Sequence, residues 1–187
     1  MPTDPSESIR HSQFFYEEEP IGVTFIKAFP ATSVGGFELG AIEEGREERL
    51  PIWIARVLEA EGFVKISGEE SQALKSTDLY KLCWKEERNE GLSKLPSHFY
   101  PRLRRLLATL NEAIKNNPTH TLLSEHRQSF MKAQDLVNCR LQKILQLARE
   151  RNPLRPSLDM LEPEELALFN SIREAIDEWR KKIVSPE

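Results

Sequence analysis

Cysteine, glycine and long apolar runs are all scarce in this chain of 187 residues. The two cysteines, Cys83 and Cys139, each lie in a helix-like segment, so we expect packing thiols in a reducing compartment rather than a disulfide framework. No apolar run approaches the ~20 residues that a membrane span requires. The polar first residues resemble neither a signal peptide nor a transit peptide. These features predict a soluble, intracellular protein without a membrane contact.

Patterns that carry catalysis or bind cofactors are missing as well. The pair Gly35-Gly36 is not followed by the Lys-Ser or Lys-Thr of a phosphate loop, and no Gly-x-Gly-x-x-Gly occurs. The histidines and cysteines are not spaced as metal ligands. Glu47-Glu48 and Glu164-Glu165 fall in an expected loop and a first helical turn, where solvation and the helix dipole account for them. We therefore predict no catalytic residue, no cofactor and no metal site.

Charge is nearly balanced overall but uneven along the chain. The 26 Lys and Arg against 30 Asp and Glu give a net charge of −4, which does not favour nucleic-acid binding by the whole chain. Residues 14–50 hold eight acidic and three basic side chains, a net of −5, whereas residues 51–187 hold 22 basic and 20 acidic ones, a net of +2. The acidic part should repel nucleic acid and suit a basic protein partner.

Residues 14–68 have the composition of a small β-rich domain. Residues 1–13, with two prolines and small polar side chains, predict a disordered N-terminus. β-branched and aromatic residues, bounded by prolines and glycines, indicate strands. The expected elements are one or two strands in 20–30, a turn at 35–36, a strand at 37–42, a charged loop from Glu43 to Arg49, a helix at 50–61 and a strand at 63–66.

Residues 69–187 predict a helical domain, because apolar residues recur there at spacings of three and four. Ser76 or Thr77 is a candidate N-cap, and Gly91 a candidate stop. The expected helices are 77–90, 102–116, 119–151 and 162–183. The predicted fold class is therefore α+β, with a small β-rich N-terminal domain followed by an all-α helical bundle domain.

Arg102, Arg104 and Arg105 stand at the start of an otherwise apolar helix, where the helix dipole disfavours cations. They suit the acidic face of another chain or a phosphate backbone, and a solvated cluster is the competing interpretation. A second basic stretch near the end of the long helix is equally explained by complementarity to the helix end. Its members are Lys143, Arg149, Arg151 and Arg155.

The last helix carries apolar residues on more than the narrow stripe that bundle packing requires. A second apolar face indicates either an oligomer interface or a fully internal Trp179. Trp53 and Trp84, which have apolar neighbours, are predicted to lie in the core. The candidate protein-interface residues of this helix are Phe169, Ile172, Ile176 and Trp179.

Two segments resemble a known family. Leu50-Pro-Ile-Trp-Ile-Ala-Arg-Val-Leu, followed by the strand Phe63-Val-Lys-Ile66, is similar to the Pro-(apolar)-Trp-(apolar)-Ala-x-x-Leu element of GINS complex subunits. Leu95-Pro-Ser-His-Phe-Tyr-Pro-Arg-Leu-Arg-Arg-Leu-Leu107 looks like the stretch that leads into their long leucine-rich helix. A β-rich unit before the helices is the order of GINS subunits two and three, which archaea replace with one protein. The compact length favours the archaeal form.

The resemblance implies a non-enzymatic subunit of a heterotetramer formed with a helix-first GINS subunit, two copies of each. It also implies assembly with the MCM helicase and a Cdc45- or RecJ-like protein in DNA replication, with at most weak DNA contact. The location would be cytoplasmic and nucleoid-associated in an archaeon, and nuclear in a eukaryote. The loop from Glu43 to Arg49 has no counterpart among the family's known roles.

A DNA-binding regulator is the alternative hypothesis. In it, the helix at 50–61 and the strand after it would form part of a winged helix. That function needs a basic recognition helix, and this helix offers only Arg56 against Glu59 and Glu61.

Overall fold

The structure, a computed structural model, describes residues 4–67 and 73–185. Its described residues form two compact units, a β unit within Gln13–Gln72 and a helical unit within Met1–Ser12 and Ala73–Glu187. Strands precede a helical bundle along the chain, so the predicted α+β class is confirmed. The predicted domain boundary, between residues 68 and 69, lies outside the described residues.

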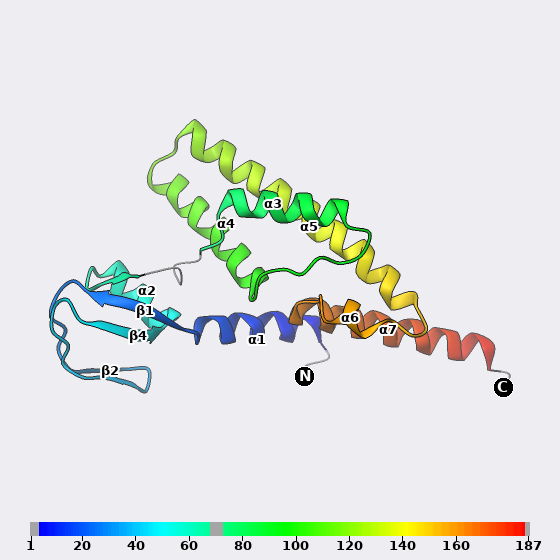
Figure 1. Cartoon of the computed structure of the whole chain (residues 1–187), viewed down its shortest axis with the longest axis horizontal. Coiled ribbons are helices and arrows are strands. Elements are labelled where there is room, and N and C mark those ends of the chain that lie inside the picture. Colours follow the sequence, from blue (N-terminus) through cyan, green and yellow to red (C-terminus); the bar gives the residue numbers. More distant parts are fainter. Residues whose placement is uncertain (1–3, 68–72, 186–187) are drawn as a thin grey trace. The chain divides into compact units, whose positions relative to one another are not determined.

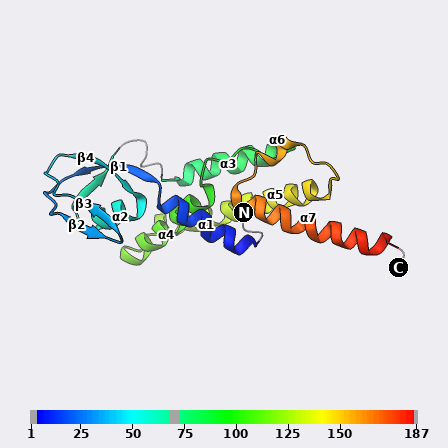
Figure 2. The ribbon, with the colours of Figure 1, turned by 90° about the horizontal axis from the view of Figure 1, so that it is seen from below.

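A three-stranded antiparallel sheet forms the centre of the β unit (Figure 2). Strand β1 (Pro20–Phe25) lies between β4 (Glu47–Pro51) and β5 (Val64–Ile66). Side chains along β1 alternate, so Ile21, Val23 and Phe25 are all buried. Helix α2 (Ile52–Ala60) packs against the sheet and completes this core with Ile54, Ala55 and Leu58.

A separate hairpin joins β2 (Thr32–Val34) to β3 (Phe37–Leu39). Gly35 and Gly36 have φ angles of 59° and 84°, the left-handed conformation that both central residues of a tight type I′ turn require. The predicted turn is confirmed. Strand β3 ends earlier than expected, and Ile42 forms an isolated bridge with Phe29 instead.

Helix α1 and strand β4 form in segments for which other structure was predicted. Helix α1 (Pro5–Glu17) occupies most of the segment that was expected to be disordered, of which residues 1–3 lie outside the described residues. Its Tyr16 is buried in the β-unit core, and its Ser8 hydroxyl donates to the Pro163 carbonyl at 3.1 Å. Strand β4 begins at Glu47, inside the expected loop, because its backbone pairs with β1 while its charged side chains stay at a sheet edge.

Long helix α5 (His120–Arg149) organises the helical unit (Figure 1). It packs against α3 (Ser76–Arg88), α4 (Phe99–Asn116) and α7 (Pro163–Val184). All four predicted helices are thus confirmed, whereas the short helix α6 (Arg155–Leu158) was not predicted. The Thr119 side chain caps α5 by accepting from the Leu122 backbone N–H at 3.2 Å. No helix among the described residues is long and apolar enough to cross a membrane.

Candidate interaction surfaces

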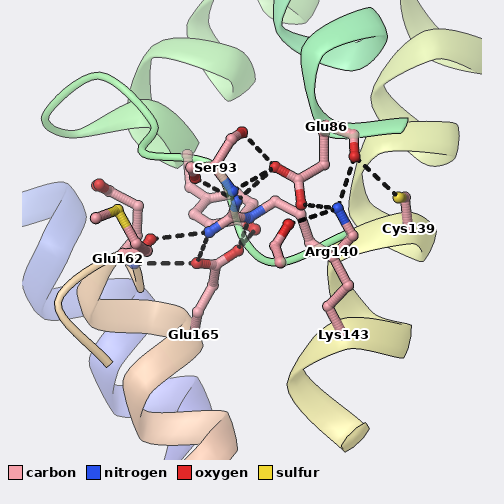
Figure 3. Close-up of polar contacts among 10 residues, drawn as sticks. Glu86, Ser93, Cys139, Arg140, Lys143, Glu162 and Glu165 are labelled. Atoms are coloured by element: carbon pink, nitrogen blue, oxygen red, sulfur yellow. Dashed lines mark hydrogen bonds and ion pairs between the residues drawn. The ribbon is translucent and has the colours of Figure 1, made fainter. Parts of the chain in front are cut away.

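A buried charged network holds the helical unit together around Arg140 on α5 (Figure 3). Its side chain is fully buried, and its five N–H groups make five hydrogen bonds. Nη2 donates to Oε2 of Glu165 at 2.6 Å, Nε to Oε1 of the same carboxylate, and Nη1 to Oε2 of Glu86 at 3.0 Å. The carbonyls of Ser93 and Met160 accept the other two. A buried guanidinium is tolerable only with such complete pairing.

Glu86 at the end of α3 is the second buried charge, and it is equally well paired. The Lys143 ammonium donates to its Oε1 at 2.7 Å, and the Ser93 backbone N–H and hydroxyl both donate to its Oε2. Burial alone would raise the pKa of Glu86, but Lys143, Ser93 and Arg140 together lower it below its ordinary 4.5. Lys143 also donates to the carbonyls of Glu86 and Gly91, so it holds the end of α3.

Glu165 connects the same network to the start of α7. It accepts from the Tyr100 hydroxyl at 2.6 Å and from the Glu162 backbone N–H at 3.0 Å, the second bond being half of a capping box. Burial and the neighbouring Glu165 raise the pKa of Tyr100 well above its usual value. The predicted position of Glu165 in the first turn of a helix is confirmed, but the prediction that this carboxylate is solvated is wrong, because it is buried.

The network was missed in the sequence, although one signal was present. Arg140 stands on the apolar seam of α5, four residues from both Leu136 and Ile144, which are buried. A cation at such a position requires buried acceptors. One guanidinium on α5 therefore holds three other segments in place. These are α3, the connection that contains Ser93, and α7.

Along α7 the apolar seam changes from buried to exposed. Phe169 is 3% exposed and belongs to the core, while Ile172 and Ile176 are half-buried against it. Trp179 is 63% exposed, and Ile183 is exposed as well. A fully internal Trp179 is therefore excluded within this chain.

The arginine cluster of α4 lies at the surface. Arg102 is half-buried, whereas Arg104 and Arg105 are exposed. Partial burial lowers the pKa of Arg104, and the nearby Glu164 carboxylate acts in the opposite direction. Glu164 is itself buried, and neither of its carboxylate oxygens has a hydrogen-bond partner among the described residues. The positive charge of Arg104 is thus one source of compensation for a buried anion.

A second apolar surface lies on α5. Leu123, Phe130 and Val137 are exposed and recur every seven residues, so they form one stripe on the helix. We call these three residues the α5 stripe. Seven-residue spacing keeps side chains on one face over several turns, which is the pattern of helix-to-helix packing.

The other two tryptophans differ from each other. Trp84 is 57% exposed on α3, with the Arg88 guanidinium 4.1 Å above its ring centroid, so its predicted core position is wrong. The reason is geometric: Cys83 and Glu86 face the core, and Trp84 lies about 100° from Cys83 and about 160° from Glu86 around the helix. Trp53 is half-buried against the core of the β unit.

One group of potential metal ligands occurs among the described residues. The Cys83 thiol and the carboxylates of Glu87 and Asp135 lie within 4.8 Å of one another. Burial, with Glu87 close by, raises the pKa of Cys83 to about 11, so the free thiol is protonated at neutral pH. Lys132 lies 3.0 Å from Asp135 and 3.9 Å from Glu87, so its ammonium group compensates the negative charge of both carboxylates.

Helix α2 does not present the basic face that a winged helix would need. Nη1 of Arg56 donates to both carboxylate oxygens of Glu17, at 2.9 and 3.0 Å, and Nη2 donates to the Tyr16 hydroxyl. The only cation of α2 is therefore engaged within its own unit.

Comparison with known proteins adds one finding. The sequence model described as Sld5, GINS complex protein helical bundle domain, matches residues 70–184, which is more than half of the chain and contains α3 to α7. No curated protein matches the chain.

Proposed function

The chain belongs to the GINS complex proteins, and from that premise we propose that it is a β-domain-first scaffold subunit of the GINS heterotetramer. GINS subunits are non-catalytic scaffold proteins of the replicative helicase complex in DNA replication. The position of the β unit before the helical bundle supports the β-domain-first class, the class of subunits two and three.

The proposed assembly contains two copies of this chain and two of a helix-first GINS subunit. The helices build the tetramer, and the acidic β unit docks a basic surface of the MCM helicase or of a Cdc45- or RecJ-like protein. GINS proteins act where DNA is replicated. That site is the nucleoid of an archaeal cytoplasm or the nucleus of a eukaryote, and direct DNA contact is weak.

The observation that carries this proposal is the apolar surface left exposed on two long helices. The seam of α7 continues past Phe169 to the exposed Trp179 and Ile183, and α5 exposes its own stripe. Tryptophan is the side chain that most often dominates a protein interface when it becomes buried there. Ile172 and Ile176 border Trp179 in this interface, Phe169 supports them from the core, and Arg102, Arg104 and Arg105 pair with acidic groups of a neighbouring subunit.

The test is Trp179→Ala in the chain co-expressed with a helix-first GINS subunit. We expect a four-chain particle for the wild type, measured by native mass spectrometry, and assembly weakened by about 2–4 kcal/mol in the variant. Trp84→Ala is the matched control, since it removes an equally exposed tryptophan from another helix. A stable wild-type monomer that does not bind the helix-first subunit would contradict the proposal.

A further inference from the structure

Helix α3 has an outer face that neither the α7 seam nor the α5 stripe includes. We call Tyr80, Lys81, Trp84, Lys85 and Arg88 the α3 patch; at about 100° per residue their positions fall within an arc of about 140° around the helix. Trp84 is its centre, exposed over 57% of its surface, with the Arg88 guanidinium stacked on its ring. The Tyr80 hydroxyl lies 3.5 Å from the Gln128 side chain of α5.

The positive charge of the patch comes from Lys85 and Arg88, because Lys81 is already paired with Asp78. Asp78 lies 3.6 Å from Lys81, and Glu87 accepts from the Cys83 thiol and lies 3.9 Å from Lys132. Glu86 is buried with Arg140 and Lys143 on the opposite side of α3. Lys85 and Arg88 form no ion pair with a carboxylate among the described residues.

We propose that the α3 patch is a docking site for an acidic segment of a partner protein. An apolar or aromatic side chain of that segment packs on Trp84, and the carboxylates of the segment pair with Lys85 and Arg88. Tryptophan, tyrosine and arginine are the residues that most often dominate binding at protein interfaces, and the surrounding lysines select an acidic partner.

The same face suits single-stranded nucleic acid less well. Such ligands need a row of cations that follows the phosphates and several aromatic rings for successive bases. The α3 patch offers one exposed tryptophan on one helix, in a chain whose net charge is −4. One exposed tryptophan beside two cations matches a short acidic peptide segment better.

The experiment measures binding of a fluorescein-labelled synthetic peptide of alternating Glu and Phe to the full chain by fluorescence anisotropy. A peptide with Gln at every Glu position tests the charge, and a single-stranded oligothymidylate tests nucleic acid. We expect saturable binding of the acidic peptide, weakening as salt increases, and much weaker binding of the other two probes. Trp84→Ala and Arg88→Glu should each weaken acidic-peptide binding by about tenfold or more.

Trp179→Ala is the matched control, because it removes an exposed tryptophan from α7 and should leave peptide binding unchanged. The two variants separate this proposal from the proposed function: Trp179 is needed for assembly, Trp84 for the peptide. No saturable binding up to about 1 mM peptide would overturn the docking site, as would equal binding by Trp84→Ala. Tighter, Trp84-dependent binding of oligothymidylate would overturn it in favour of nucleic acid.

Discussion

Arg140 connects α3, α7 and the segment that contains Ser93 to α5 through one buried side chain. Replacing it with Met keeps an apolar stem of similar length but leaves Glu86 and Glu165 buried without their common cation. Removing one partner of a buried ion pair costs about 3–5 kcal/mol. We therefore expect Arg140→Met to lower the free energy of unfolding by that amount, measured by urea denaturation of the full chain.

The control for this prediction is Arg105→Met, the same change at an exposed position of α4. It should alter the free energy of unfolding by less than about 0.5 kcal/mol, as exposed substitutions usually do. A similar, small effect of both variants would mean that water or rearranged side chains solvate the two carboxylates once Arg140 is gone.

Glu86 gives the same network a pH dependence. Because its pKa is lowered in the folded chain, its contribution to stability is complete above the unfolded value of about 4.5 and is lost as the pH falls through the lower, folded value. We expect the free energy of unfolding to fall less between about pH 6 and pH 3 in Glu86→Gln than in the wild type. Urea denaturation across this range measures the free energy of unfolding at each pH. Glu112→Gln, a change at an exposed position, is the control. An equal fall of the free energy of unfolding with pH in all three proteins would refute the role of Glu86.

At the scale of elements, the β2–β3 hairpin depends on its two glycines for different reasons. Both have positive φ, but a Cβ on Gly35 would also lie 2.9 Å from Cη2 of Trp53, whereas a Cβ on Gly36 would meet nothing within 4 Å. A left-handed conformation costs an L-residue about 1–2 kcal/mol. We expect Gly35→Ala to destabilise the β unit by more than this amount and Gly36→Ala by about this amount.

Gly40→Ala is the matched control for the hairpin, because Gly40 has open space around it and no positive φ. It should leave the thermal unfolding midpoint unchanged or raise it slightly, since alanine restricts the unfolded chain. If all three variants unfold at one temperature, the hairpin does not contribute to the cooperative stability of the β unit.

Elements whose signals are local could be predicted from the sequence, and those held by distant contacts could not. Apolar residues at spacings of three and four predicted a helix from residue 119, close to the start of α5, and the glycine pair predicted the hairpin turn. Helix α1 was not predicted because its stabilising contacts join residues that are far apart in the sequence. Ser8 and Pro163 are 155 positions apart, and Glu17 and Arg56 are 39 positions apart. Strand β4 was not predicted because its charged sequence is typical of a loop, and only its pairing with β1 makes it a strand.

For the whole molecule, the sequence indicated a second apolar face on α7, but neither the α5 stripe nor the exposure of Trp84. Trp84 follows the buried Cys83 directly, yet one residue turns the side chain by about 100° around the helix, from core to solvent. Arg140 reaches Glu86 over 54 positions and Glu165 over 25, so only the assembled bundle identifies them as partners. Apolar and charge patterns indicate which helix faces are suited to packing. Tertiary packing then determines which of those faces remain exposed.

The α5 stripe provides the prediction at this scale. Phe130 and Val137 are 46% and 38% exposed, so replacing both with Ser should cost the isolated chain little stability. In an assembly that packs a neighbouring helix on this stripe, the same change removes two buried apolar side chains, each contributing about 1.5–3 kcal/mol. We expect Phe130→Ser with Val137→Ser to convert the co-expressed four-chain particle into smaller species in native mass spectrometry.

Met131→Ser is the control, an exposed change about 100° away around the helix, and it should leave the four-chain particle intact. Unchanged assembly of the double variant would remove the α5 stripe from the interface and leave α7 as the contact helix.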